Sequence, residues 1–194
     1  MAEEEIYEYQ LKIPKERIAV LIGKEGDIKK RLEEATKVKV DVDSKEGEVT
    51  VSGSDALSLL TAREIIHAIA RGFNPETAML LLKVDCGLEI LSLHDYAKTS
   101  NDALRLKGRV IGKEGKARRV IETITDCHIS VYGKTIAILG ESEKLAVARR
   151  AVDSLLKGSP HSRVYKWLER QKRQMDSMEL YPGEIASEDT EDDS

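Results

Sequence analysis

The chain has 194 residues, enough for one medium domain or for two domains of under a hundred residues each. Charged residues make up 34% of it, above the roughly 25% of an average globular protein, so we expect a folded and heavily solvated surface. No apolar run approaches the roughly 18 residues of a membrane span, and the first residues lack the basic and apolar segments of a signal peptide. We therefore expect a cytoplasmic protein without a membrane partner.

The formal net charge of −4 is unevenly distributed along the chain. Nine of the 35 acids lie near the ends, at residues 3–5 and 184–193, whereas all 31 Lys and Arg lie between residues 6 and 182. The central part therefore has 31 bases against 26 acids, a charge of +5. This charge is compatible with a polyanionic partner despite the acidic isoelectric point.

Two stretches of the chain are copies of one unit. Residues Ile22–Gly26 and Ile111–Gly115 both read Ile-Gly-Lys-Glu-Gly, and the same offset aligns Glu33 with Glu122. Agreement over a fixed offset indicates a tandem repeat.

Hydrophobic periodicity predicts the same order of elements, β-α-α-β-β-α, in each copy. In the first copy the patterns predict a strand at 7–13, a helix at 14–21, a helix opened by the second glycine, strands at 38–42 and 49–51, and a helix at 54–72. In the second copy they predict a strand at 88–93, a helix at 100–110, a helix opened by the second glycine, strands at 127–131 and 135–138, and a helix at 142–158. Ser54 and Ser142 are the expected N-caps, and Gly72 and Gly158 are the expected left-handed C-caps.

We divide the chain into two repeated domains and three further segments. The domains are 1–73 and 88–158, joined by a helical linker at 74–87 and followed by a C-terminal helix with basic faces at 159–182. The acidic segment 183–194 has almost no large apolar residues, so we expect it to be disordered.

The glycine pair in each copy is suited to binding an anion. A turn between two helices presents backbone N–H groups at the N-terminus of the second helix, where the helix dipole adds partial positive charge. Two residues without side chains also let a sugar-phosphate backbone approach the main chain closely. An isolated glycine pair is more often a plain helix cap, but two identical copies in the same context favour a binding loop.

With this loop, strand order and terminal helix, each copy resembles a type I KH domain over residues 7–72 and 88–158. The resemblance implies an α+β fold of two tandem domains, each a three-stranded antiparallel sheet packed against three helices. It further implies a cleft for about four unpaired nucleotides, with the glycine loop on the RNA backbone and aliphatic side chains beside the bases. The chain has eight aromatic residues, which argues against RNA-recognition folds that stack bases on sheet aromatics.

The two copies differ in charge around the loop. Residues 106–119 have a net charge of +5, against +2 for residues 17–30, where Asp27 takes the place that Lys116 has in the second copy. We therefore expect the second copy to be the main RNA site. Its expected RNA-binding residues are Lys107, Arg109, Ile111, Gly112, Lys113, Glu114, Gly115, Lys116, Arg118, Arg119, His128 and Ile129, with Glu114 directed to solvent. Gly23, Lys24, Glu25 and Gly26 form the expected secondary site.

The layout of the whole chain resembles the partner-of-Nob-one family of archaea and eukaryotes. The resemblance rests on two closely joined KH units, an acidic N-terminus and a C-terminal helix that begins PHSRVYKWLE. It implies binding of single-stranded RNA near the 3′ end of small-subunit ribosomal RNA and help in its processing. It also implies contact with the Nob-one endonuclease and a link to an initiation factor subunit. Eukaryotic members lack the first glycine pair, whereas Gly23 and Gly26 are present here, so both copies remain candidates for RNA binding.

The sequence gives no motif for catalysis, and we expect no enzyme, cofactor or metal. Neither nucleotide-binding glycine motif occurs, the four histidines are scattered, and Cys86 and Cys127 lack the spacing of a zinc or disulfide site. Two alternatives to a ribosomal RNA-binding factor remain: a KH-fold scaffold for protein contacts, and a tandem-KH factor of transcription or RNA decay. The single tryptophan, Trp167, is either a packing residue or a contact for a protein partner.

Overall fold

The computed structural model describes residues 6–180 and confirms the predicted order of elements in both repeats. The first repeat consists of β1 (Tyr7–Lys12), α1 (Lys15–Ile22), η1 (Lys24–Gly26), α2 (Asp27–Thr36), β2 (Lys39–Asp43), β3 (Glu48–Gly53) and α3 (Ala56–Ala70). The linker holds α4 (Pro75–Ala78) and η2 (Met79–Leu82). The second repeat consists of β4 (Cys86–Ser92), η3 (Leu93–Asp95), α5 (Ser100–Ile111), η4 (Lys113–Gly115), α6 (Lys116–Thr125), β5 (His128–Tyr132), β6 (Thr135–Glu141) and α7 (Ser142–Leu156), and α8 (His161–Leu180) follows. The acidic residues 3–5 and 183–194 lie outside the described residues.

Each repeat contains a three-stranded antiparallel sheet with its last strand in the middle. The orders are β1-β3-β2 and β4-β6-β5. In the two sheets Val40 pairs with Val51 and Ile129 with Ile138, so the two repeats have matching registers. This is the predicted α+β arrangement.

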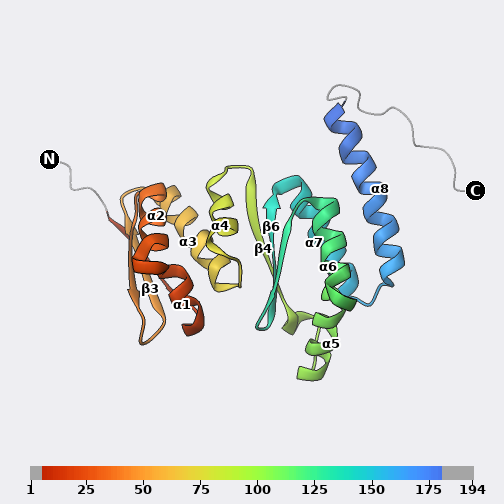
Figure 1. Cartoon of the computed structure of the whole chain (residues 1–194), viewed down its shortest axis with the longest axis horizontal. Coiled ribbons are helices and arrows are strands. Elements are labelled where there is room, and N and C mark those ends of the chain that lie inside the picture. The colour runs from red at the N-terminus through yellow and green to blue at the C-terminus, as the bar shows by residue number, and fades with distance from the viewer. Residues whose placement is uncertain (1–5, 181–194) are drawn as a thin grey trace, which may run out of the picture.

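The middle strand of the second sheet is buried on both faces. Residues Ile136–Leu139 of β6 have no exposed surface, and Ala137 and Leu139 belong to the core of the first repeat rather than to that of their own. The sheets and helices therefore follow one another along the long axis as sheet, helices, sheet, helices and finally α8 (Figure 1). The second sheet therefore packs against helices of both repeats and joins them into one continuous structure. We call this sheet the shared wall.

Polar contacts also join the repeats at this wall. The Ser130 hydroxyl on β5 donates to the Arg71 carbonyl at 2.7 Å, and the Tyr132 hydroxyl donates to the Glu16 carboxylate on α1. A Cβ on Gly72 would lie 2.6 Å from the Ser130 oxygen, so this glycine is required for the close approach of the two repeats as well as for its left-handed φ of 98°.

The helix caps differ partly from the predicted ones. Asp55, not Ser54, caps α3 and accepts from the Ser58 amide at 2.8 Å. Ser142 is the first residue of α7 and its hydroxyl donates to the Asp85 carbonyl, so it ties the helix to the linker instead of capping it. Gly158 has the predicted left-handed φ.

The C-terminal helix α8 packs on α6 and α7 as the last layer (Figure 1). Val164 and Leu168 are buried in the second core, and Trp167 is half-buried against it. Trp167 is therefore a packing residue, in agreement with the first of the two predictions for it.

The shared wall gives the first testable prediction. We expect Leu139→Ala to lower the free energy of unfolding by about 2 to 5 kcal/mol, because it opens a cavity between the two repeats. Denaturant unfolding followed by circular dichroism measures this, with Leu57→Ala, an exposed leucine on α3, as the control that should change stability by less than about 0.5 kcal/mol. Equal effects of the two substitutions would contradict the shared core.

Candidate nucleic-acid interface

The loop between the first two helices of each repeat has the same unusual backbone in both copies. In the second repeat, Gly112, Glu114 and Gly115 have φ angles of 72°, 53° and 75°, and α6 begins at Lys116. Left-handed φ angles are ordinary for glycine but cost energy at the glutamate. The surrounding helices therefore hold this loop in a defined shape.

The two glycines of the loop serve different purposes. A Cβ on Gly112 would lie 2.7 Å from the Cβ of Ala117, so Gly112 allows α5 and α6 to pack closely. A Cβ on Gly115 would meet no atom of the described residues within 4 Å. The second glycine therefore presents bare backbone to solvent, and a bulky ligand can approach it.

The amides of these glycines do not have the role that the sequence suggested. The Gly112 N–H donates to the Gly108 carbonyl at 2.8 Å, and the Gly115 N–H donates to the Gly112 carbonyl at 3.2 Å. Both N–H groups are already hydrogen-bonded within the turn that ends α5 and starts α6, so neither is free to bind an anion. The loop offers an open glycine surface and the exposed side chains of Lys113, Glu114 and Lys116 instead.

Arg109, predicted to contact RNA, is bound within the fold. Its Nε donates to the Leu155 carbonyl at 3.0 Å and its Nη2 to the Ser159 carbonyl at 2.7 Å, so its guanidinium holds the end of α7 against α5. The unpaired carbonyls at a helix C-terminus need such donors. These bonds give Arg109 a structural role that the sequence did not predict.

The first repeat contains the same arginine clamp at a different sequence position. Arg17 donates from Nε to the Ile69 carbonyl at 2.7 Å and from Nη2 to the Phe73 carbonyl, at the end of α3. Arg17 lies six residues before its first glycine, whereas Arg109 lies three before its own. Because the two positions do not align in the repeat, the sequence comparison did not reveal the shared function.

Ile129 is also a structural residue. It is only 4% exposed and belongs to the second core, and its amide donates to the Glu122 carboxylate at 2.8 Å. In the first repeat Val40 and Glu33 make the same bond. The repeated glutamate thus caps the edge strand, and His128, which is exposed beside it, is the predicted residue of this strand that a ligand can reach.

An apolar strip on α5 leads to the loop. Leu104 is 69% exposed and Ile111 is 37% exposed, with Gly108 exposed between them and open space beside its α-carbon. The spacing of four and three residues places all three on one helix face. Ile111 was predicted, whereas Leu104 and Gly108 were missed, although their helical spacing from Ile111 is visible in the sequence.

Positive charge surrounds this strip. Lys107, Lys98 and Lys134 line a hollow of about 480 Å³ together with Leu104, between α5 and the β5–β6 turn. Within residues 6–180 these three lysines form no ion pair. Of the other predicted residues, Lys113, Lys116, Arg118 and Arg119 are exposed around the loop.

Two of these loop cations have partners within the chain. The Arg119 Nη2 donates to the Glu114 carbonyl at 2.8 Å, and the Arg118 Nε lies 3.4 Å from the Glu122 carboxylate. Arg119 thereby supports the strained glutamate of the loop. Lys113 and Lys116 are the cations left to meet a ligand at the second glycine.

The loop of the first repeat is similar in shape but less positive. Its second glycine, Gly26, is open like Gly115, but a carboxylate oxygen of Asp27 lies against the α-carbon of Gly23. Lys24 and Glu25 are exposed at the tip, and Lys29 pairs with Glu33 at 3.9 Å. A carboxylate at the start of α2, where the second repeat has Lys116, makes this loop the weaker site for a polyanion.

The described part of the chain holds no metal-binding cluster beside these loops. Residues 6–180 contain no cluster of three His, Cys, Asp or Glu side chains able to hold a metal ion, and none of their helices has the length and apolar character to cross a bilayer. Burial raises the pKa of the Cys127 thiol to about 11, so this thiol is protonated at neutral pH and is a poor nucleophile.

Comparison with known families matches both repeats. The family model of the eukaryotic type KH-domain, KH-domain type I, matches residues 87–173, and the KH domain model matches residues 8–68.

Among known proteins, the chain is 48% identical to a KH domain-containing protein of Methanocaldococcus jannaschii, over 85% of this chain and 74% of that protein. It is 31% identical to the pre-rRNA-processing protein PNO1 of Coccidioides immitis, over 66% of this chain and 52% of that protein. Among solved structures it is similar to Dim2p of Pyrococcus horikoshii OT3 in complex with a/eIF2alpha and rRNA, with 44% identity, a TM-score of 0.81 and coverage of 87% of this chain and 96% of that one.

The unequal glycines give a second prediction. We expect Gly112→Ala to cost about 2 to 5 kcal/mol of stability, because a left-handed φ and a steric clash with Ala117 act together. Gly115→Ala should cost only about 1 to 2 kcal/mol of stability, since the left-handed φ is unfavourable for alanine but no steric clash is added. Thermal and denaturant unfolding measure both, and equal losses would contradict the separate roles of the two glycines.

The arginine clamp gives a third prediction. We expect Arg109→Gln to lower the free energy of unfolding by about 1 to 3 kcal/mol, because two carbonyls at the end of α7 lose a charged donor. Arg105→Gln, an exposed position on the same helix whose arginine only pairs with Asp102 at 3.6 Å, is the matched control. If Arg109→Gln were as stable as Arg105→Gln, the structural role of the Arg109 hydrogen bonds would be contradicted.

Proposed function

The chain belongs to the KH-domain PNO1/Dim2 family, and from this membership we propose that it binds single-stranded RNA, at the 3′ end of small-subunit ribosomal RNA, during processing of that RNA. The observation that carries the proposal is the open backbone at Gly115, which lies at the end of the apolar strip on α5 and between two exposed lysines. Such a surface fits a strand that has both unpaired bases and a phosphate backbone. The Pyrococcus relative, solved with rRNA, supports the choice of RNA.

Each part of the second repeat has a role in this binding. The sugar-phosphate backbone passes over Gly115, where a side chain would obstruct it, and Lys113 and Lys116 neutralise the adjacent phosphates. The bases lie against Leu104, Gly108 and Ile111, with Lys107 and His128 at the margins. Gly112, Arg109 and Ile129 hold this surface in place without touching RNA. Glu114 points to solvent, and Arg118 and Arg119 add positive charge beside the loop.

The first repeat provides the secondary site. Gly23, Lys24, Glu25 and Gly26 form a loop of the same shape, but the Asp27 carboxylate lowers the attraction for phosphates. We propose that this site adds little to affinity.

The protein acts by binding rather than by catalysis, in the cytoplasm, and needs no cofactor. We propose that it brings processing partners to the RNA: an initiation factor subunit, as the a/eIF2alpha in the Pyrococcus complex suggests, and the Nob-one endonuclease. A KH-fold scaffold or a general factor of transcription or RNA decay would not prefer the 3′ end of small-subunit RNA over random RNA, which a competition experiment measures.

The loop variants test the RNA site directly. We expect K113D/E114D to weaken binding of a single-stranded 3′-terminal small-subunit RNA by more than about tenfold, because the charge beside the phosphates is reversed. The matched variant K24D/E25D, at the equivalent tip of the first repeat, should cost clearly less. Fluorescence anisotropy measures both, and circular dichroism establishes that both variants are folded.

The salt dependence provides a second readout of the same site. If the wild-type protein neutralises about four phosphates, its affinity should fall roughly fifty-fold between about 50 and 200 mM salt, at a slope of about 0.7 for each contact. Equal RNA binding by K113D/E114D and the wild type would refute the site. A flat salt dependence would favour the scaffold.

A further inference from the structure

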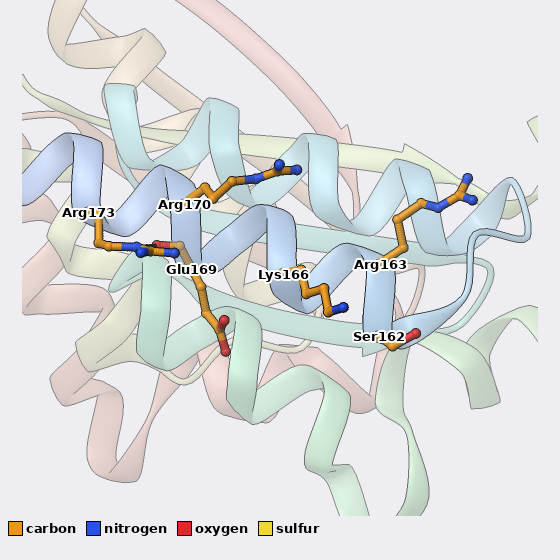
Figure 2. Close-up of a pocket in the computed structure, with 6 residues that line it drawn as sticks. All are labelled: Ser162, Arg163, Lys166, Glu169, Arg170 and Arg173. Atoms are coloured by element: carbon orange, nitrogen blue, oxygen red, sulfur yellow. Dashed lines mark hydrogen bonds between the residues drawn. The ribbon is translucent and has the colours of Figure 1, made fainter.

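The outer face of α8 has a row of cations that the proposed RNA site does not use. Arg163, Lys166, Arg170 and Arg173 are exposed and line a shallow hollow of about 440 Å³ with Ser162 and Glu169 (Figure 2). Their spacing of three, four and three residues keeps them on one side of the helix over a length of about 15 Å. We call these four residues the α8 row.

Among the described residues, the four cations of the α8 row have no acidic partners, whereas several basic residues elsewhere on the surface do. Arg31 pairs with Glu76, Arg149 with Glu89, Lys144 with Glu141 and Lys157 with Asp153. Within residues 6–180, none of the four cations of the α8 row forms an ion pair, although Glu169 lies among them. Like charges three and four residues apart on a helix repel one another, so the row is a cost to the free protein that a polyanion would relieve.

A fifth cation extends this surface onto α7. The Arg150 guanidinium stacks over the Trp167 ring at 5.0 Å from its centre, and a second hollow of about 220 Å³ is lined by Arg150, Arg163, Trp167 and Arg170. Cation–π stacking limits the freedom of the arginine while leaving its N–H groups free to donate at the edge. The charges therefore stand on two helices that Val164 and Leu168 hold together.

The start of α8 is attached to the helix that carries the RNA loop. His161 Nε2 donates to the Arg109 carbonyl at 2.8 Å, and Arg109 in turn donates to the Ser159 carbonyl. Arg109 lies three residues before Gly112, and His161 lies two before Arg163. The α8 row thus starts beside the end of α5, in a fixed relation to the glycine loop.

We propose that the α8 row, with Arg150, is a second RNA surface that binds the phosphate backbone of the nucleotides flanking the segment held by the glycine loop. This inference rests on the proposed function for the identity of the polyanion. Guanidinium groups bind phosphates in bidentate fashion, and four cations over about 15 Å suit a repeating phosphate chain. Because these long side chains face backbone and not bases, the surface adds affinity without adding sequence preference.

The test compares a short RNA with longer ones. The short probe is a single-stranded 3′-terminal small-subunit sequence of about four nucleotides, which fills one KH cleft. Two longer probes continue it on the 5′ or the 3′ side, as in the precursor RNA, far enough to span the row. We expect wild-type protein to bind at least one longer probe more tightly and with a steeper dependence on salt than the short one.

Neutralising the row should remove this gain and nothing else. For R163Q/K166Q/R170Q/R173Q we expect unchanged affinity for the short probe. On the longer probe its log–log salt slope should be shallower by about 0.7 for each lost contact, roughly 2.8 in all. The control R31Q/K39Q/K144Q/K157Q removes the same charge from positions that are ion-paired, and it should retain the gain.

The outcomes separate this inference from the proposed function. An unchanged salt slope and length gain in the row variant would overturn the inference and would favour an acidic protein segment as the occupant of α8. An equal loss in the control would also overturn it, since net charge alone would then explain the effect. If K113D/E114D bound the short probe as well as wild type did, the loop assignment would fail, whereas loss of the long-probe slope in the row variant would still support the α8 surface.

Discussion

The close packing of α5 on α6 is the constraint on which the proposed site depends. The two helices meet where Gly112 has no side chain, and the space that a Cβ would need is taken by Ala117. This contact forces the next residues into left-handed conformations, uses both glycine amides inside the turn and turns the α-carbon of Gly115 outward. The loop is thus shaped by the packing of the fold before any ligand arrives, so little conformational entropy has to be lost on binding.

The shared sheet extends this order to the whole chain. Because β6 is buried on both faces, the helices of the first repeat serve as the outer layer of the second sheet, and α8 takes the equivalent place beyond the second set of helices (Figure 1). The Arg109 clamp and the His161 bond connect α8 back to α5. The two glycine loops and α8 therefore keep fixed positions relative to one another, which a flexibly linked pair of domains would not achieve.

The fold could be predicted from the sequence because the repeat doubled every signal. Two aligned copies of the glycine loop and of the following helix and strands left one consistent order of elements. The double burial of β6 was also visible in principle, since Ile-Ala-Ile-Leu is a continuous apolar run, whereas Val-Thr-Val in β3 alternates.

The site was harder to predict, because Arg109 looks like any basic residue near the loop until the carbonyls of Leu155 and Ser159, some fifty positions away, are brought beside it. The burial of Ile129 was not predicted either, because alternation in a strand shows which residues share a face, but not which face a ligand reaches.

Net charge is a poor guide to the ligands of this protein, because the cations of the surface fall into two groups. Residues such as Arg149 and Lys157 are matched by nearby acids and contribute little to the field at a distance. Lys98, Lys107 and Lys134 beside the apolar strip, and the four cations of the α8 row, have no such partners among the described residues. A chain with an overall charge of −4 therefore presents positive surfaces in specific places. Since His161 attaches α8 to the end of α5, the surface on α8 begins beside the helix that carries the apolar strip.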